Sequence, residues 1–290
     1  MSPGPVAVVT DSTAYLPEGF AQRHRVRVVP LHVVIDDRSG RDGIDIGPAE
    51  LATALGERRR VTTSLPATGE FVTVYRDLLD AGASSVVSVH LSRQLSGTWD
   101  SARLAAEEVG PQRVRVVDSR TTGMGLGFAA LHAARRAAAG ASGADVEDTA
   151  VRVAAGTTMY FVVDTLEYLR RGGRIGGAAA LLGTALSVKP LLHMKDGSIV
   201  GLEKVRTTSR AVSRLVDLAV AAAGERAVDV AVHHLAAPDR AAELANRLDD
   251  RVRGSSGCLV SELGAVIGAH TGPGVLGVVV SPADQDAPQR

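Results

Sequence analysis

The first half of the chain alternates short apolar runs with amphipathic stretches. Residues 6–10 and 85–89 are valine-rich and have the length of buried strands. Residues 26–34 form a similar run, in which Pro30 indicates a sheet edge or a bulge. Residues 71–78 place their apolar side chains at the spacing of one buried helix face. Strands that alternate with helices predict a parallel sheet with helices on both faces, so the expected fold class is α/β.

The second half has a different pattern. An apolar, helix-like segment spans residues 177–186, and residues 195–198 carry a strong turn signal between two strand-like runs. Such a turn predicts a hairpin, and therefore antiparallel strands. Further strands are expected over residues 228–233, 258–263 and 274–280. These elements predict a second α/β unit whose sheet is mixed.

Length and composition are consistent with two domains. The chain has 290 residues, which exceeds the roughly 100–200 residues of an average domain. An apolar fraction of 45% and a charged fraction of 22% are sufficient for full hydrophobic cores. We predict an N-terminal parallel α/β domain over residues 1–160 and a C-terminal α/β domain with a mixed sheet over residues 161–290.

Charge and cysteine content exclude several classes of protein. Basic and acidic residues number 32 each and aromatic residues make up 3%, which argues against nucleic-acid binding. A single cysteine, Cys258, cannot form an internal disulfide, and no histidine spacing predicts a metal site. The N-terminus lacks the pattern of a signal peptide, and no apolar run reaches 18 residues. We therefore expect a soluble, cytoplasmic protein.

Hydroxyl-rich segments at residues 62–64 and 92–98 are the first candidates for a binding site. Both follow or lie beside predicted parallel strands, so they are expected at one end of the sheet. Ser96, Gly97 and Thr98 precede a helix, whose free N–H groups and dipole favour an anion such as a carboxylate or a phosphate. Helix capping by Ser96 and Thr98 explains the same residues and stays open as an alternative.

His270 is the second candidate. It lies in the glycine-rich segment 268–274, which we expect to form a turn before a strand, with neither a helix nor a core face to account for the histidine. Such a side chain can orient a hydroxyl, accept a proton or bond a backbone carbonyl. A contact between Ser96 and His270 would also suit an esterase, but the Gly-x-Ser-x-Gly motif is absent and no orienting acid is evident.

Two further motifs have less specific interpretations. The glycines of residues 123–127 have the wrong spacing for a dinucleotide loop and favour close packing of a helix on the sheet. Arg170, Arg171 and Arg174 surround a Gly-Gly pair and form a local basic patch. The patch is either a solvated helix end or a docking surface for an acidic partner or an anionic membrane.

Seven short segments follow one another over nearly the whole chain. They are residues 9–12 (VTDS), 62–66 (TTSLP), 95–99 (LSGTW), 117–119 (VDS), 166–175 (LEYLRRGGRI), 189–190 (KP) and 270–274 (HTGPG). Together these segments resemble the DegV family of fatty-acid-binding proteins, the FakB-type subunits of bacterial fatty acid kinase. The family loop is commonly Thr-Ser-Gln-Pro, whereas this chain has Leu65 in place of the glutamine.

The resemblance implies an α/β carrier that holds a long-chain fatty acid in a tunnel between two domains. It implies that Thr63 and Ser96 bind the fatty-acid carboxylate, with His270 close by. Ser64, Gly97 and Thr98 would form the supporting loop. We expect neutral hydrogen-bonding groups, without an arginine salt bridge, to hold this carboxylate.

The resemblance also implies a partner, a separate fatty acid kinase catalytic subunit that phosphorylates the carboxylate to an acyl phosphate. The chain itself would be no enzyme, with no catalytic residue, no metal and no cofactor, and with the long-chain fatty acid as its ligand. Arg171 and Arg174 are candidates for docking to the kinase or for a transient membrane contact. A Ser/His-dependent esterase and a lipid-sensing regulatory protein are the alternatives.

Overall fold

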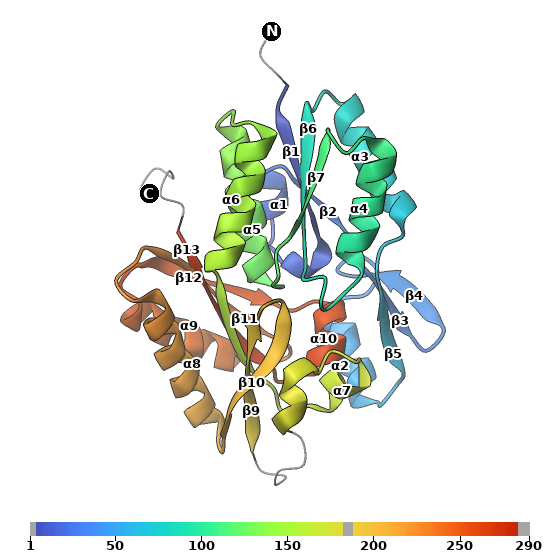
Figure 1. Cartoon of the computed structure of the whole chain (residues 1–290). Helices are drawn as coiled ribbons and strands as arrows, with labels where there is room; N and C mark the ends of the chain where they lie inside the picture. The colour runs from blue at the N-terminus through green and yellow to red at the C-terminus, as the bar shows by residue number, and fades with distance from the viewer. Residues whose placement is uncertain (1–3, 182–187, 284–290) are drawn as a thin grey trace.

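The computed structural model describes residues 4–181 and 188–283. In this part of the chain the strands form a four-stranded sheet, a three-stranded sheet and a six-stranded sheet. We refer to them as the parallel sheet, the small sheet and the mixed sheet. The parallel sheet and the mixed sheet lie in the two halves of the molecule (Figure 1), as the α/β pattern predicts.

The parallel sheet has the order β2-β1-β6-β7, and neighbouring strands are parallel throughout. The strands are β1 (Val6–Asp11), β2 (Val26–Val29), β6 (Ser85–His90) and β7 (Val114–Asp118). Helices cover both faces, with α3 and α4 on one side and α5 and α6 on the other (Figure 1). They are α3 (Thr68–Asp80), α4 (Thr98–Val109), α5 (Met124–Ala138) and α6 (Gly143–Gly156). The predicted parallel α/β arrangement is confirmed.

The small sheet was not foreseen. Residues 26–34 are not one strand, because β2 ends at Val29 and β3 (His32–Ile35) pairs antiparallel with different neighbours. Pro30 lies at this break and has no N–H for a ladder, so the chain leaves the parallel sheet there. The sheet is completed by β4 (Arg38–Arg41) and β5 (Val61–Ser64), and α2 (Pro48–Gly56) connects these two strands. The prediction that residues 62–64 lie beside parallel strands is therefore wrong.

The mixed sheet has the order β10-β9-β8-β13-β11-β12, and β11 with β12 is its parallel pair. Its strands are β8 (Thr158–Val162), β9 (Lys189–Lys195), β10 (Ser198–Val205), β11 (Val228–His234), β12 (Ser255–Glu262) and β13 (Leu276–Pro282). Asp196 and Gly197 both have positive φ, as a two-residue hairpin turn between β9 and β10 requires. The predicted hairpin and the mixed sheet are confirmed. Helices α8 (Thr208–Ala223) and α9 (Pro238–Arg251) cover one face.

The remaining helical elements of the described residues are short. They are η1 (Ser12–Ala14), α1 (Phe20–Arg23), α7 (Glu167–Arg171), η2 (Gly176–Leu181) and α10 (Ala265–Thr271). The apolar segment expected at 177–186 is a 3-10 helix where it is described, and residues 182–187 lie outside the described residues. Strand β8 spans the proposed boundary between residues 160 and 161, so the division into domains there stays a prediction.

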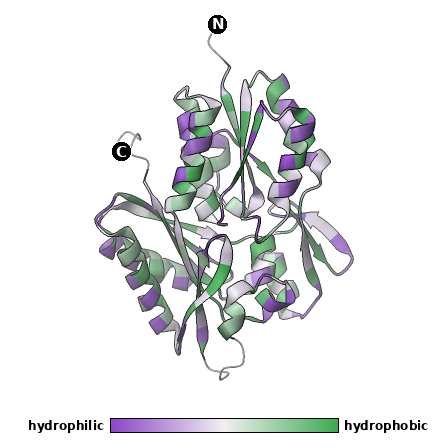
Figure 2. Cartoon of the chain, viewed as in Figure 1, coloured by the Kyte–Doolittle hydropathy of each residue, from purple (hydrophilic) through white to green (hydrophobic). Residues whose placement is uncertain are grey.

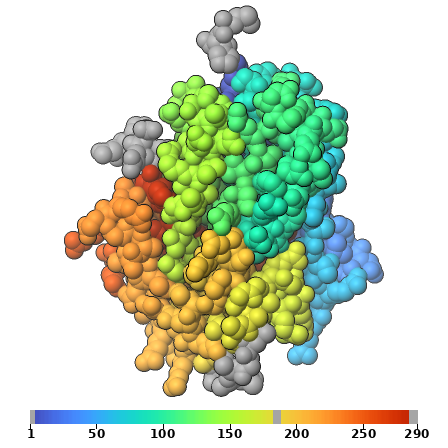
Figure 3. Space-filling view, viewed as in Figure 1, coloured from blue at the N-terminus to red at the C-terminus, as the bar shows by residue number. Residues whose placement is uncertain are grey.

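The two halves share one hydrophobic core. Val89 and Leu131 of the first half belong to the same buried cluster as Phe161, Leu192 and Val279 of the mixed sheet. Apolar residues line the strands and the helix faces turned toward them, whereas α8 and α9 carry polar residues outward (Figure 2). On the face seen in Figure 3 the two halves are packed directly against each other. The shared core holds the elements around the site in place.

Candidate functional site

A cavity of about 290 Å³ is lined by residues of both halves. This volume is close to the lower end of the roughly 300–1,000 Å³ that is typical of small-molecule sites. Most of the lining is apolar, with Met159 and Phe161 from β8, Met194 from β9 and Leu169 from α7. An apolar lining of this extent suits a ligand with a long hydrocarbon part.

The predicted head-group residues meet in this cavity. Thr63, Ser64, Ser96 and His270 all belong to its lining, although they come from β5, the loop before α4 and α10. Gly97 and Thr98 are absent from the lining within the described residues. Folding has therefore brought together the hydroxyls and the imidazole from distant parts of the chain.

His270 lies on a helix, and the prediction of a turn is wrong. Helix α10 runs from Ala265 to Thr271 and ends before Gly272, which has a positive φ. The Nε2 atom of His270 is 2.9 Å from the Thr63 Oγ1 atom. Its Nδ1 atom is buried without a hydrogen-bond partner among the described residues, and a Cβ atom at Gly172 would lie 2.0 Å from it. Glycine is therefore required at position 172 for the ring to pack there.

The electrostatic environment keeps His270 neutral. Burial, and then the positive charge of Arg174, lower the pKa of His270 from 6.5 to about 4. We assign the ring hydrogen to Nε2, because this nitrogen has the Thr63 oxygen within reach. Thr63 Oγ1 then accepts from the imidazole, and its own hydroxyl hydrogen remains available to donate to a ligand anion.

Ser96 lies at the start of α4. Its hydroxyl is 2.9 Å from Thr98 Oγ1 and accepts a hydrogen bond from the Thr98 N–H at 3.3 Å. The N-cap residue is Gly97, which has no side chain to bond the first-turn N–H groups. The Ser96 hydroxyl therefore bonds one N–H group at the start of the helix and also lines the cavity, and its role in ligand binding stays a prediction.

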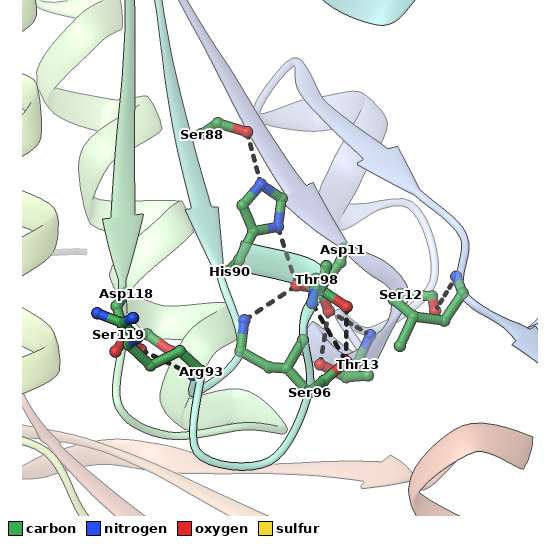
Figure 4. A network of polar contacts seen from close by, with 12 residues as sticks. Asp11, Ser12, Thr13, Ser88, His90, Arg93, Ser96, Thr98, Asp118 and Ser119 are labelled. Atoms are coloured by element: carbon green, nitrogen blue, oxygen red, sulfur yellow. Dashed lines mark hydrogen bonds and ion pairs between the residues drawn. The ribbon is translucent and has the colours of Figure 1, made fainter. Parts of the chain in front are cut away.

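A buried carboxylate fixes the chain that leads to Ser96. Asp11, at the end of β1, accepts hydrogen bonds from His90 Nδ1 and from the Leu91 N–H, both at 3.0 Å. It also accepts from the hydroxyl and the N–H of Thr13. Asp11 and His90 are fully buried, and Figure 4 shows them at the exit of β6. The network holds the start of the loop that carries Ser96.

Ser88 extends this network, so that Ser88, His90 and Asp11 form a hydrogen-bonded Ser–His–Asp series. Its Oγ atom is 2.7 Å from His90 Nε2 (Figure 4) and accepts a hydrogen bond from the Tyr75 hydroxyl at 2.9 Å. The arrangement resembles a hydrolytic triad. Ser88 is fully buried, so its hydroxyl has no access to a substrate. We therefore assign a structural role to the Ser–His–Asp series.

Ser92 attaches the same loop to the other half of the molecule. Its hydroxyl donates to the Gly197 carbonyl at 2.6 Å, in the turn between β9 and β10. Its carbonyl accepts from the N–H groups of Leu95 and Ser96. This contact could not be predicted from the sequence, because no spacing rule connects Ser92 with Gly197.

The two candidate arginines lie in different environments. Arg174 lines the cavity and donates to the carbonyl groups of Leu95 at 2.9 Å and Gly172 at 2.6 Å. The side chain of Arg171 is 71% exposed and pairs with Glu167. Arg174 belongs to the cavity lining, but its guanidinium bonds two backbone carbonyls, so the expectation that no arginine salt bridge holds the carboxylate stays a prediction. A docking role for either arginine stays a prediction.

Leu65 lines the cavity together with the hydroxyl residues Thr63 and Ser96. It lines the cavity while remaining 42% exposed, and a Cβ atom at Gly97 would lie 3.2 Å from its Cδ2 atom. An apolar side chain stands here in place of the amide that the family loop commonly carries. Leu65 therefore adds apolar surface beside Ser96 and offers no hydrogen bond to a head group.

His233 is a cavity residue that the sequence did not single out. Its Nε2 atom accepts from the Met124 N–H at 2.7 Å, and its Nδ1 atom donates to the Ser261 carbonyl at 3.1 Å. These partners fix a neutral tautomer, and burial lowers its pKa to about 4. His233 joins the start of α5 to the mixed sheet, and both of its nitrogens are already bonded.

Within residues 4–181 and 188–283, no group of three or more histidine, cysteine, aspartate or glutamate side chains could hold a metal ion. No helix in this part of the chain is long and apolar enough to span a membrane.

The fold and the cavity define an α/β protein with a mostly apolar cavity that residues of both halves line. Residues 5–283 match a family model described as an uncharacterised protein of the DegV family. A DegV domain-containing protein of Streptomyces coelicolor is 56% identical over 276 residues, which cover 95% of this chain and 98% of that protein. The chain belongs to the DegV family, as the seven sequence segments predict.

Solved structures of the family share the whole fold. A fatty-acid-binding DegV family protein from Thermus thermophilus has a TM-score of 0.92 and 37% identity, covering 96% of this chain and 100% of that chain. DegV from Bacillus subtilis, a fatty acid binding protein, has a TM-score of 0.88 and 34% identity, covering 97% and 100%. These structural neighbours are fatty-acid-binding proteins.

Proposed function

We propose that this chain binds a long-chain fatty acid, with the hydrocarbon tail in the cavity and the carboxylate at Thr63, Ser96 and His270. The observation that carries the proposal is the meeting of these three side chains in the wall of a mostly apolar cavity. The fatty-acid binding described for the Thermus thermophilus and Bacillus subtilis proteins supports it.

Affinity is expected to come mainly from the tail. Burial of each CH₂ group contributes about 0.8 kcal/mol, so a chain of about 16 carbons gains on the order of 12 kcal/mol before the costs of ordering. The head group sets the orientation, because a buried carboxylate without partners costs several kcal/mol. Hydroxyl donors at Thr63 and Ser96 supply these partners.

Arg174 favours the anionic form of the bound head group. Its guanidinium is permanently charged and lies in the same wall as the neutral His270. A nearby positive charge favours the ionised carboxylate over the acid. The ligand is therefore expected to bind as the anion.

We further propose that the bound carboxylate is presented to a separate kinase. One of its oxygens would attack the γ-phosphorus of ATP on that kinase, which forms an acyl phosphate and releases ADP. This chain would contribute orientation and shelter, with no catalytic residue of its own. Arg171, exposed beside the site on α7, is the candidate for docking to the kinase or to a membrane surface, and Arg174 is the second candidate.

The hydrogen bonds favour a carrier over an esterase. His270 bonds Thr63, and Ser96 bonds Thr98. Among the described residues no hydrogen bond joins Ser96 to His270, whereas a nucleophilic serine needs its base within reach. The lipid-sensing alternative would use the same cavity without transfer of the ligand to a kinase.

Purified protein is expected to retain lipid and to respond to added fatty acid. Native mass spectrometry should show an adduct of fatty-acid mass, and oleate should raise the melting temperature of delipidated protein, because a ligand that binds the folded state stabilises it. No turnover of a p-nitrophenyl acyl ester is expected. Absence of both the adduct and the shift would contradict binding. Acyl phosphate formation with a fatty acid kinase and ATP would separate a carrier from a sensor.

Substitution of Thr63 by valine tests the head-group assignment. The change keeps the shape of the side chain and removes the hydroxyl, so a hydrogen bond to a charged group worth about 1.5–3 kcal/mol is lost. Oleate affinity, measured by competition with a fluorescent fatty acid, should fall about tenfold to hundredfold. Thr62→Val is the matched control, because Thr62 is the exposed neighbour on the same strand. A loss below about threefold for Thr63→Val, or equal losses for both, would refute the assignment.

A further inference from the structure

Helix α10, which carries His270, cannot cap its own N-terminus. The residue at its N-cap is Gly264, which has no side chain to bond the first N–H groups. A Cβ atom at Gly264 would lie 2.4 Å from Tyr15 Cε1 and 2.7 Å from Asp42 Oδ1. Glycine is therefore required at this position, because two side chains from the first part of the chain closely approach the end of the helix.

These two side chains supply the missing cap. The N–H groups of Ala265 and Val266 donate to Asp42 Oδ1 at 2.8 Å and 3.4 Å. The N–H group of Ile267 donates to the Tyr15 hydroxyl at 3.0 Å, and this hydroxyl donates to Asp42 Oδ2 at 3.2 Å. The first N–H groups of a helix have no partner within the helix. In α10, three successive ones bond the same pair of side chains.

Asp42 is itself fixed to the small sheet, which carries Thr63. It directly follows β4, it is 2% exposed, and its N–H donates to the Leu31 carbonyl at 2.8 Å. Ser12 donates to Asp42 Oδ2 at 2.9 Å and accepts from the Leu31 N–H at 3.1 Å. Strand β3 pairs with β4 on one side and with β5, the strand of Thr63, on the other. One carboxylate therefore connects the sheet of Thr63 to the helix of His270.

Tyr15 reaches this carboxylate from a strained backbone conformation. Its φ of 43° and ψ of 48° lie in the left-handed region, which costs free energy for a residue with a Cβ atom. Its carbonyl accepts from the Ser261 hydroxyl of β12 at 2.6 Å. Strain of this kind persists only where the surrounding contacts impose it. The bonds of Tyr15 to Asp42, Ile267 and Ser261 are such contacts.

The position of α10 decides how Thr63 meets a ligand. His270 Nε2 is 2.9 Å from Thr63 Oγ1, and its donation leaves the hydroxyl hydrogen of Thr63 free for the carboxylate. A hydrogen bond needs a donor–acceptor distance of about 3 Å, so a shift of α10 by about 1 Å would break it. The Thr63 hydroxyl would then rotate, and the ligand would lose a donor that is already oriented before binding.

We propose that Asp42 and Tyr15 are positioning residues of the head-group site, which hold the first turn of α10 against the small sheet and so set the place of His270 relative to Thr63. This inference rests on the proposed fatty-acid binding. It adds two residues outside the cavity lining that determine how well the carboxylate is recognised, while the tail binds independently of them.

The test compares oleate with oleyl alcohol, which has the same tail and no carboxylate. Affinities are measured by competition with a fluorescent fatty acid on delipidated protein, below the melting temperature of each variant. Tyr15→Phe removes the hydroxyl that joins Ile267 to Asp42. It should lower oleate affinity about fivefold or more, while the affinity for oleyl alcohol changes by less than about twofold.

Asp42→Asn is a second variant that reaches the same contacts from the other side. It replaces one carboxylate oxygen by an NH₂ group, which cannot accept a hydrogen bond. The ratio of oleate affinity to oleyl alcohol affinity should fall in this variant as well, about threefold or more.

Combination with Thr63→Val tests the route of the effect. If Tyr15 acts through His270 and Thr63, Tyr15→Phe should lower oleate affinity by less than about twofold once the Thr63 hydroxyl is absent. A loss in the double variant equal to the product of the two single losses would mean that Tyr15 does not act through Thr63, and would overturn the inference.

Tyr160→Phe is the matched control, because it makes the same chemical change on β8 at a residue outside the cavity lining. The control should keep both wild-type affinities. Equal losses of oleate and oleyl alcohol affinity are the result of a merely structural cap, and they overturn the inference but leave fatty-acid binding intact. Unchanged oleate affinity in both the Tyr15 and the Asp42 variant does the same. Failure of oleate to bind the wild type overturns the proposed function as well.

Discussion

Replacement of Asp11 by alanine should lower the free energy of unfolding by about 4 kcal/mol. The carboxylate is fully buried and accepts hydrogen bonds from Thr13, His90 and Leu91. Its removal leaves these donors without a partner, and each unsatisfied buried group costs about 1–3 kcal/mol. Urea unfolding, followed by circular dichroism, measures the loss.

The matched control for this variant is Asp77→Ala. Asp77 is exposed on α3, so its replacement should change stability by less than about 0.5 kcal/mol. Because Asp11 also fixes the loop that carries Ser96, the Asp11 variant should bind oleate more weakly at temperatures where it remains folded. A stability loss similar to that of the control would mean that the network does not hold this loop.

Acidification should destabilise the folded protein through His233 and His270. The pKa of each is lowered to about 4 in the folded state, against 6.5 in the unfolded chain. Between these values the unfolded state binds more protons, so stability is fully present above pH 6.5 and is lost as the pH falls toward 4. From pH 7 to pH 4.5 we expect a loss of about 2 kcal/mol for each histidine.

Single variants isolate these two contributions. Burial raises the pKa of Asp42, so its protonation favours the folded state at low pH and opposes the histidines. His233→Gln and His270→Gln should each remove about half of the histidine contribution, measured as urea unfolding of delipidated protein at several pH values. An unchanged pH dependence in both variants would mean that the two imidazoles are not held neutral by the fold.

The parallel half of the fold was predictable because its signals are local. Short valine-rich runs separated by amphipathic helices determine such a sheet with little help from distant residues. The small sheet escaped prediction because residues 26–34 read as one apolar run, while Pro30 actually marks the change of sheet. Helix α10 escaped because it has seven residues, glycine at its N-cap and a further glycine inside it.

The hydroxyl-rich segments and His270 could each be recognised as candidates from the sequence. That they line the same cavity could not be predicted from it. No spacing rule connects Thr63 with His270, and only the resemblance of the whole chain to a family placed them at one head group. Arg174 is interpreted from the sequence as part of either a solvated helix end or a docking surface, because its contacts with Leu95 and with the cavity depend on tertiary packing. Asp11 belongs to the VTDS segment of the family resemblance, but its burial and its hydrogen-bond network depend on tertiary packing.

The hydrogen bond between Thr63 and His270 joins residues that are 207 positions apart. Closing so long a loop is costly in chain entropy, and proteins rich in distant pairings fold slowly. On the ribosome, β5 emerges long before α10 does. The wall of the cavity is therefore completed only after α10 has left the ribosome, and until then a nascent chain has no complete cavity.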